Sequence, residues 1–376
     1  MRKHLFVLLF FIICSCKKED IEIDISSKAN VLKVIEAERG IQQLDAVSFC
    51  VVKGNEILWS DAIGNATRSG TATANTRFFI ASISKTVTAV AIMQLAESNR
   101  LDLDADINIY LPFQIRNPHH PNVPITTRML LNHSSSISDA FYYTFDFTCW
   151  NQDCTIPLGQ YLQDFFDVNG QFYSNKNFHK YLPSSQSNYS NLGFALLGYI
   201  VERIANQPFD DYCEQNIFLP LGMQKTEWRL KNVPLSELAV PFSPTITPNE
   251  PYYTLPDYPA GGVITTPDDF SIFLRMFIKK GTFNGAQILR PQTIALMQQK
   301  TLSLVRGGLK FDMGLGMYYH QYKGKELYGH GGGDQGITTN MAYDIENEVG
   351  VLVFNNSTLK NLDLIVYSLY QFGTKQ

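Results

Sequence analysis

Strand-like segments lie at both ends of this 376-residue chain, and a long, mainly helical stretch separates them. Residues 47–63 read as two strands joined by a Lys-Gly-Asn turn, and residues 317–329 and 338–354 repeat this pattern near the other end. Between them, residues 78–262 show mainly helical spacing, with connections rich in Pro, Asn and Ser. We therefore expect the two ends to join in one antiparallel sheet, into which a helical lobe is inserted.

Helices are expected to flank that sheet. Residues 31–44 carry apolar side chains at helical spacing, and residues 362–372 form an apolar helical pattern at the C-terminus. The predicted fold class is α+β, an antiparallel sheet flanked by N- and C-terminal helices with a mainly helical lobe inserted over about residues 78–262. Residues 31–376 are expected to form one domain of this kind.

The charge of the chain bears on its partners. It holds 31 Lys and Arg against 35 Asp and Glu, a formal net charge of -4, without a basic block. Nucleic acid is bound by basic patches that follow the phosphates, so we expect no nucleic-acid partner.

The first residues predict export. Two basic residues precede an apolar run over residues 5–13, which is shorter than the ~20 residues that cross a bilayer as a helix. Residues 1–15 are therefore predicted to be a signal peptide. The end of the run resembles a bacterial lipobox, which implies that Cys16 carries a lipid and that residues 16–30 form a tether. The lipid would anchor the chain in the bacterial cell envelope, and the outer membrane is the expected site. A plain cleaved signal peptide is the alternative.

The other cysteines favour structural roles. In an exported chain the close pair Cys149 and Cys154 can form a disulfide, and the sequence leaves open whether it does. Cys50 and Cys213 are expected to be small buried residues. No zinc-ligand spacing occurs, and the acidic residues at 102, 104 and 106 lack the rest of a calcium loop, so neither a metal nor a cofactor is expected.

An S-x-x-K motif stands at the start of a helical pattern. Its spacing of three places Ser82 and Lys85 on one helix face. A lysine whose pKa is lowered by burial can take the proton of a serine hydroxyl, and the free N–H groups of a helix start suit an oxyanion. The motif alone is weak, because Ser357 and Lys360 form a second copy and a capping serine with a solvated lysine gives the same pattern.

Two further motifs follow along the chain. Tyr189 and Asn191 precede a strongly apolar helical pattern, and we prefer them to the same tripeptide at Tyr173, which has no such helix after it. His330 opens an H-x-G-G stretch after a strand, where small residues let a substrate approach the backbone. A strand pattern follows these glycines, which excludes a dinucleotide-binding turn and leaves a hairpin with a bystander histidine as the alternative.

In this order and context, the three motifs resemble those of the serine β-lactamase and penicillin-recognising superfamily, nearest its class C β-lactamase, DD-peptidase and esterase branch. Similar stretches occur at residues 130–135, 218–223 and 259–262, and the resemblance runs from about residue 30 to the end. It implies a serine hydrolase whose serine is acylated by an ester or amide substrate, which is a small molecule or a peptide.

The resemblance also implies a role for each motif residue. Ser82 is the nucleophile, Lys85 its proton partner and Tyr189 the general base and acid. The N–H groups of Ser82 and Gly333 form the oxyanion hole. The implied substrate-binding residues are Asn191, His330 and Gly332.

His330 is the most informative departure from the family pattern. An imidazole replaces the permanent ammonium that grips a substrate carboxylate, so weak or absent β-lactamase activity is expected, in favour of peptidase, amidase or esterase activity. Ser136 stands where the branch often has Gly, and His133 is interpreted as a structural loop residue. The competing hypothesis is a catalytically inactive lipoprotein of the same fold that binds peptides or cell-wall fragments.

Overall fold

The computed structural model describes residues 25, 27–67, 70–243, 246, 251–306, 309–358 and 360–376. The predicted signal peptide and Cys16 lie outside the described residues, as does most of the predicted tether. Helix α1 (Lys28–Gln42) begins after the capping residue Ser27, whose hydroxyl accepts a hydrogen bond from the N–H of Asn30. Within the described part of the chain, no helix is both long and apolar enough to cross a membrane.

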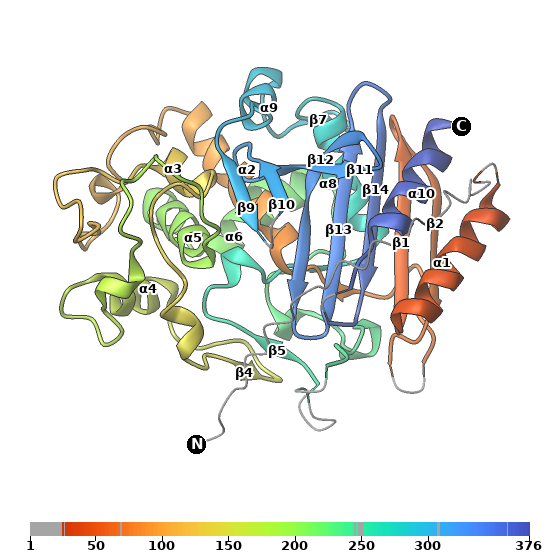
Figure 1. Ribbon diagram of the computed structural model, residues 1–376, viewed down its shortest axis with the longest axis horizontal. Helices are drawn as coiled ribbons and strands as arrows, with labels where there is room; N and C mark the ends of the chain where they lie inside the picture. The colour runs from red at the N-terminus through yellow and green to blue at the C-terminus, as the bar shows by residue number, and fades with distance from the viewer. Residues whose placement is uncertain are drawn as a thin grey trace.

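Six of the described strands form one antiparallel sheet, in the order β11-β12-β13-β14-β1-β2. Strand β1 pairs with β14, with Cys50 opposite Leu352, so segments from the two ends of the chain lie side by side in the sheet (Figure 1). The predicted fold class is thereby confirmed. The strands of the sheet are β1 (Ala46–Lys53), β2 (Glu56–Gly64), β11 (Tyr318–Tyr322), β12 (Lys325–Asp334), β13 (Ile337–Asp344) and β14 (Val349–Asn355).

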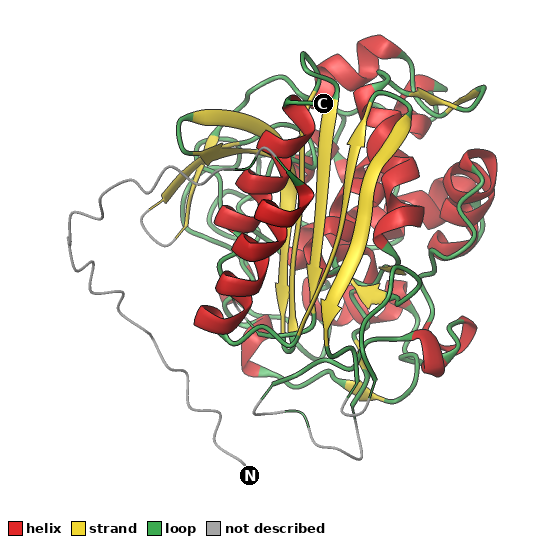
Figure 2. Cartoon of the chain, turned by 90° about the vertical axis from the view of Figure 1, so that its right-hand side faces the viewer, coloured by secondary structure: helices red, strands yellow, loops and turns green. Residues whose placement is uncertain are grey.

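The central strands are buried on both faces because helices cover each side. Alternate side chains point to opposite faces of a strand, so Phe49 and Val51 pack with α1 and α10 (Asp363–Thr374), while Cys50 and Val52 join the larger core. Figure 2 shows α1 and α10 across one face, with further helices behind the sheet. On that second side, α8 (Pro267–Ile278) packs against β1 and β14.

The helical lobe leaves and rejoins the sheet at a short strand pair, in which Phe78 of β3 (Phe78–Phe79) pairs with Thr265 of β6 (Ile264–Thr265). Helix α2 (Ser84–Glu97) runs through its centre and packs against α5 (Asn191–Ala205). Small and apolar residues occur on every side of α2, and nearly all of them are buried, as expected for a helix in the middle of a core. The starts of α2 and α5 carry two of the predicted motifs.

Shorter elements complete the chain. The other helices are α3 (Thr127–Leu131), α4 (Leu158–Phe166), α6 (Phe209–Cys213), α7 (Leu219–Leu221) and α9 (Pro291–Met297). The other strand pairs are β4 (Cys149–Trp150) with β5 (Tyr253–Thr254), β7 (Thr282–Phe283) with β8 (Ala286–Gln287), and β9 (Ser303–Arg306) with β10 (Leu309–Asp312).

Candidate active site

Ser82 lies in the single turn of 3-10 helix Ala81–Ile83 that leads into α2. Its hydroxyl is partly exposed and borders a cavity, whereas Lys85, one turn later, is 0 % exposed. The Nζ of Lys85 is 3.2 Å from the Oγ of Ser82. This distance is within the range over which a proton can pass between an alcohol and an amine.

Two further oxygen atoms fix the position of the Lys85 amine. Its Nζ donates to the Oδ1 of Asn191 at 2.7 Å and to the carbonyl oxygen of Ala260 at 2.6 Å. Ala260 lies in the stretch of residues 259–262, which is one of those that resemble the family, and Asn191 begins α5. Segments that are far apart in the sequence therefore meet at one buried amine.

Tyr189 also lies near this amine. The Lys85 Nζ is 4.8 Å from the centre of the Tyr189 ring. The His133 ring packs against Tyr189 at 4.4 Å between centroids, and its Nδ1 accepts a hydrogen bond from the N–H of Ser190 at 3.2 Å. His133 thus holds the loop that carries Tyr189, as its interpretation as a structural residue requires.

Asp139 is a positioning residue that the sequence reasoning missed. Its carboxylate accepts hydrogen bonds from the Ser190 hydroxyl at 2.7 Å and from the backbone N–H groups of Asn191 and Leu192. Ser190 in turn caps α5 by accepting from the N–H of Gly193 at 2.9 Å. Burial raises the pKa of Asp139 above its usual range, while these hydrogen bonds oppose that rise. No local spacing indicates that Asp139 meets a residue 51 positions later.

Strand β12 brings the third motif to the same place. A Cβ added to Gly332 would lie 2.3 Å from the carbonyl oxygen of Ile80 and 2.2 Å from the Thr339 hydroxyl, so this close approach requires glycine. Thr339 donates a hydrogen bond to Ile80 at 2.8 Å, which joins the sheet to the segment before Ser82. Gly333 borders the same cavity as Ser82.

His330 is buried beside the site. It is 1 % exposed, and it does not line the cavity, as is also the case for Lys85, Tyr189 and Gly332. The His330 ring packs 4.6 Å from that of Tyr318, and its Nδ1 lies 2.6 Å from the carbonyl oxygen of Gly331. The imidazole is thus a buried neighbour of the site, with its ring 6.3 Å from that of Tyr189.

The cavity beside Ser82 has a volume of about 190 Å³. Aromatic side chains form much of its wall, including Phe79, Tyr142, Trp228, Tyr253 and Tyr258. Two carboxylates that the sequence reasoning missed, Asp257 and Asp334, also line it. Burial raises the pKa of Asp257 to about 6 and raises that of Asp334 above its usual range.

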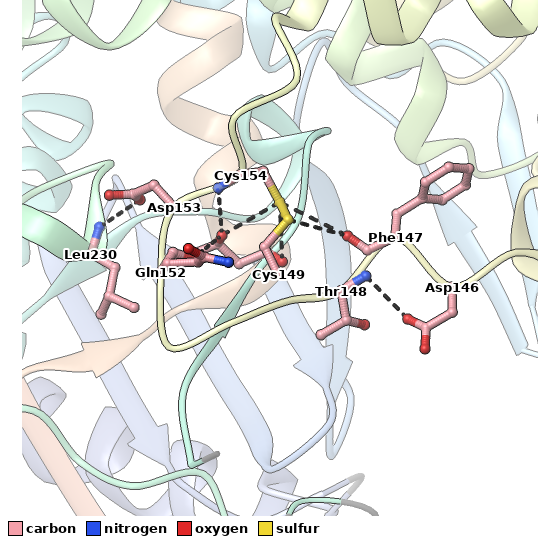
Figure 3. The surroundings of a disulfide bond; sticks show 9 residues. Asp146, Phe147, Thr148, Cys149, Gln152, Asp153, Cys154 and Leu230 are labelled. Carbon is pink, nitrogen blue, oxygen red and sulfur yellow. Dashed lines mark hydrogen bonds between the residues drawn. A yellow bond between two sulfur atoms is a disulfide. The ribbon is translucent and has the colours of Figure 1, made fainter. Parts of the chain in front are cut away.

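A disulfide joins Cys149 and Cys154 (Figure 3), and Cys154 lines the cavity. The neighbouring Asp153 accepts hydrogen bonds from the N–H groups of Leu230 at 2.8 Å and Lys231 at 3.0 Å. The pairing that the sequence left open is therefore present. It closes one short loop, and the hydrogen bonds of Asp153 join this loop to the segment that carries Leu230. Cys50 and Cys213 are free and buried, as predicted.

The duplicate motifs have other environments. The Ser357 hydroxyl donates to Asp45, and the Nζ of Lys360 donates to the carbonyl oxygen of Gln42, so both support the start of β1. Near Tyr173, the Ser174 side chain caps a short turn. The cavity is lined by none of these residues of the duplicate motifs, which are Tyr173, Ser174, Ser357 and Lys360.

Comparison with known proteins gives a family-model match to "Beta-lactamase" over residues 32–367. "Protein flp" of Staphylococcus aureus (strain N315) is 25% identical over 254 residues, which cover 66% of this chain and 48% of that protein. "Beta-lactamase-like protein 2" of Dictyostelium discoideum is 26% identical over 318 residues, which cover 80% of this chain and 54% of that protein. The chain thus spans about half the length of these curated relatives.

Solved structures show the same fold. The D-amino acid amidase from Ochrobactrum anthropi SV3 complexed with D-phenylalanine has a TM-score of 0.73 at 22% identity, covering 92% of this chain and 97% of that one. The octameric penicillin-binding protein homologue from Pyrococcus abyssi has a TM-score of 0.70 at 22% identity, covering 91% of this chain and 76% of that one.

Proposed function

Because the chain belongs to the β-lactamase family, as the resemblance of its motifs indicated, we propose that it is a serine hydrolase that forms an acyl-enzyme on Ser82. The contact that carries the proposal is the 3.2 Å distance between the Lys85 Nζ and the Ser82 Oγ. A serine hydroxyl becomes a useful nucleophile only when a base within hydrogen-bond reach can take its proton.

Acylation would begin with attack of the Ser82 Oγ on the carbonyl carbon of an ester or amide. The reactive form is the one in which the Lys85 ammonium has lost a proton. Its neutral amine then takes the hydroxyl proton and becomes the ammonium again, while the carbonyl electron pair moves to the oxygen. The N–H groups of Ser82 and Gly333, which line one cavity, would stabilise that oxyanion. When the tetrahedral intermediate collapses, the bond to the leaving group breaks and the leaving group takes a proton from Tyr189.

Deacylation would repeat these steps with water. Tyr189, left as a phenolate when the leaving group departs, removes a proton from water as the water oxygen attacks the acyl carbon. The Ser82 Oγ leaves and takes its proton back from the Lys85 ammonium, and the carboxylic acid product departs. The hydrogen bond from Lys85 to Asn191 supports this role, because it fixes the amine near Ser82 and near the Tyr189 ring.

The charges around the site favour substrates without a carboxylate near the scissile bond. His330 is a buried imidazole in place of a permanent ammonium, and three acidic residues, Asp153, Asp257 and Asp334, line the cavity. The imidazole removes a permanent attraction for a substrate carboxylate, and the carboxylates of the cavity repel it, since like charges in a confined site repel strongly. We therefore propose an amidase, peptidase or esterase with weak or absent β-lactamase activity.

The experiment is a turnover screen of the purified chain against neutral esters, peptides and β-lactams, with Ser82→Ala as the control. Hydrolysis of an ester or amide by the wild type, lost by at least a thousandfold in Ser82→Ala, supports the proposal. Equal hydrolysis by both proteins overturns it. Binding of peptides without any turnover would instead favour the inactive binding protein.

We also propose that Cys16 carries a lipid that anchors the chain to the bacterial envelope. Metabolic labelling with a fatty-acid analogue tests this proposal, because label should appear on the wild type and not on Cys16→Ser. Label on both proteins, or on neither, would contradict it.

A further inference from the structure

We propose that the cavity beside Ser82 binds a protonated amine of the substrate through Asp257 and Asp334. The preferred substrates would then be amides or esters of acyl groups that carry an ammonium group, such as amino acids with a free amine. The inference rests on the acyl-enzyme proposed for Ser82, and it names the substrate class of that site.

Both carboxylates are placed where an acyl group would lie. Asp257 and Asp334 line the same cavity as Ser82 and Gly333. Asp334 directly follows Gly333 on β12 and shares a strand face with Gly332, whose missing Cβ would point toward the segment before Ser82. A group bound at Asp334 is therefore next to the N–H expected to hold the carbonyl oxygen.

Asp257 lacks the partners that a buried carboxylate usually has. It is 4 % exposed, and its Oδ2 accepts from the Tyr142 hydroxyl at 3.3 Å. In the described part of the chain, its buried Oδ1 has no hydrogen-bond partner. Buried carboxylates are normally paired or fully hydrogen-bonded, so this oxygen indicates a missing donor.

The other charged groups of the cavity are already engaged. Arg229 pairs with Asp210 through two hydrogen bonds, at 2.5 and 3.0 Å. Asp153 accepts from two backbone N–H groups, whereas Asp334 accepts from one, that of Gln335 at 2.7 Å. Among the described residues, neither Asp257 nor Asp334 forms an ion pair.

Lys85 is the cation that these carboxylates share. It interacts electrostatically with Asp257, Asp334 and Asp139, so three carboxyl groups surround one amine. The Lys85 Nζ donates hydrogen bonds to Ser82, Asn191 and Ala260. A second cation, supplied by the substrate, would balance the remaining negative charge.

The wall of the cavity suits an ammonium on an apolar body. Its aromatic side chains, among them Phe79, Trp228 and Tyr253, offer ring faces to a cation and apolar surface to a side chain. We therefore choose phenylalanine derivatives as probes, in both enantiomers. N-acetylation of the same compounds removes the positive charge.

The turnover experiment compares kcat/KM for phenylalanine p-nitroanilide with that for its N-acetyl form. We expect the wild type to prefer the free amine by at least tenfold. Asp257→Asn and Asp334→Asn should each lower the ratio of kcat/KM for the free amine to kcat/KM for the N-acetyl form by about tenfold, the usual size of a charge-assisted hydrogen bond. The ratio is the readout because an effect through Lys85 changes both substrates alike. No preference in the wild type would overturn the inference.

Asp153→Asn is the matched control, because it removes a carboxylate from the same cavity wall that is already hydrogen-bonded to backbone. Its preference for the free amine should stay within threefold of the wild type. An equal loss of preference in Asp153→Asn would show that a diffuse negative field, and not a site at Asp257 and Asp334, attracts the amine. That result would overturn the inference. If Asp257→Asn and Asp334→Asn slow both substrates equally, the carboxylates act only on Lys85, which also overturns the inference.

A binding measurement separates this inference from the proposed hydrolysis. Calorimetry on Ser82→Ala should show tighter binding of phenylalaninamide than of N-acetylphenylalaninamide, without any turnover. Such a preference combined with an inactive wild type would support the ammonium site and reject the hydrolase. Wild-type hydrolysis of neutral esters, together with no binding preference in Ser82→Ala, would reject the ammonium site and leave the hydrolase standing.

Discussion

The Nζ of Lys85 lies 2.7 Å from the side-chain oxygen of Asn191, although 106 positions separate the two residues. This hydrogen bond joins the start of α2 to the start of α5. A buried amine that is held from two sides keeps one position relative to Ser82. Preorganisation of this kind is what catalysis by proton transfer requires.

Replacing Lys85 tests its role directly. Lys85→Met keeps the length of the side chain and removes the amine, so kcat/KM for a neutral ester should fall by about 10²–10⁴, the usual contribution of a general base. Circular dichroism and thermal unfolding check that the variant folds. A folded variant within tenfold of wild-type activity would contradict the role.

Asp139 should act on activity through the start of α5. Asp139→Ala removes three hydrogen-bond acceptor contacts, to Ser190, Asn191 and Leu192, and should cost about 2–4 kcal/mol of unfolding free energy. Its kcat for a neutral ester should fall while KM changes little, because Asn191 and Tyr189 lose their positions. Asp139→Asn keeps an acceptor oxygen and should recover most of the kcat. A stability loss with unchanged kcat would show that Asp139 is only structural.

The raised pKa of Asp257 predicts how stability depends on pH. The pKa is about 6 in the folded state against about 3.9 in an unfolded chain, so burying the charged form destabilises the fold above pH 6. That penalty falls as pH drops from 6 to 4, because the folded state binds a proton that the unfolded state does not. Asp257→Asn should therefore be more stable than the wild type by about 2–3 kcal/mol at pH 7.5.

Urea unfolding of both proteins at pH 7.5 and pH 4 measures this difference. It should shrink to near zero at pH 4, where Asp257 is protonated in the folded protein. A wild type that is the more stable protein at pH 7.5, or an equal difference at both values, would contradict the assignment.

The close approach of Gly332 to Ile80 and Thr339 predicts that a single added methyl group at position 332 lowers the stability of the fold. Gly332→Ala places a Cβ against the Ile80 carbonyl and the Thr339 hydroxyl, so it should destabilise the chain by about 1–3 kcal/mol and lower activity as β12 moves away. Gly40→Ala is the control, since nothing lies within 4 Å of the added Cβ in α1. It should stabilise the helix by about 1 kcal/mol. Equal thermal shifts in the two variants would refute the packing argument.

The fold could be predicted from sequence because its pattern is local. Alternating strands and periodic helices mark the ends of the chain, and burial of apolar faces then joins β1 to β14. The mainly helical segment between β3 and β6 begins and ends where Phe78 pairs with Thr265. Helix α1 begins at Lys28, three residues before the expected start of the domain, because Ser27 caps it.

The cavity could not be predicted in the same way. Short sequence motifs mark Ser82, Lys85, Tyr189 and Asn191. No such motif marks Asp139, Asp257 or Asp334. Each of these carboxylates matters only through contacts made after folding, such as that of Asp139 with Ser190. Ser136 shows the reverse case, because its φ of 65° lies in the left-handed region that favours glycine, the residue that the family resemblance predicts there.

The most direct measurement of the central claim is the intact mass of the protein after reaction with a fluorophosphonate, followed by peptide mapping. We predict one added phosphonyl group per chain, located on Ser82 and absent from Ser82→Ala. Modification of another residue, or none on a folded wild type that hydrolyses esters, would contradict the assignment of Ser82 as the nucleophile.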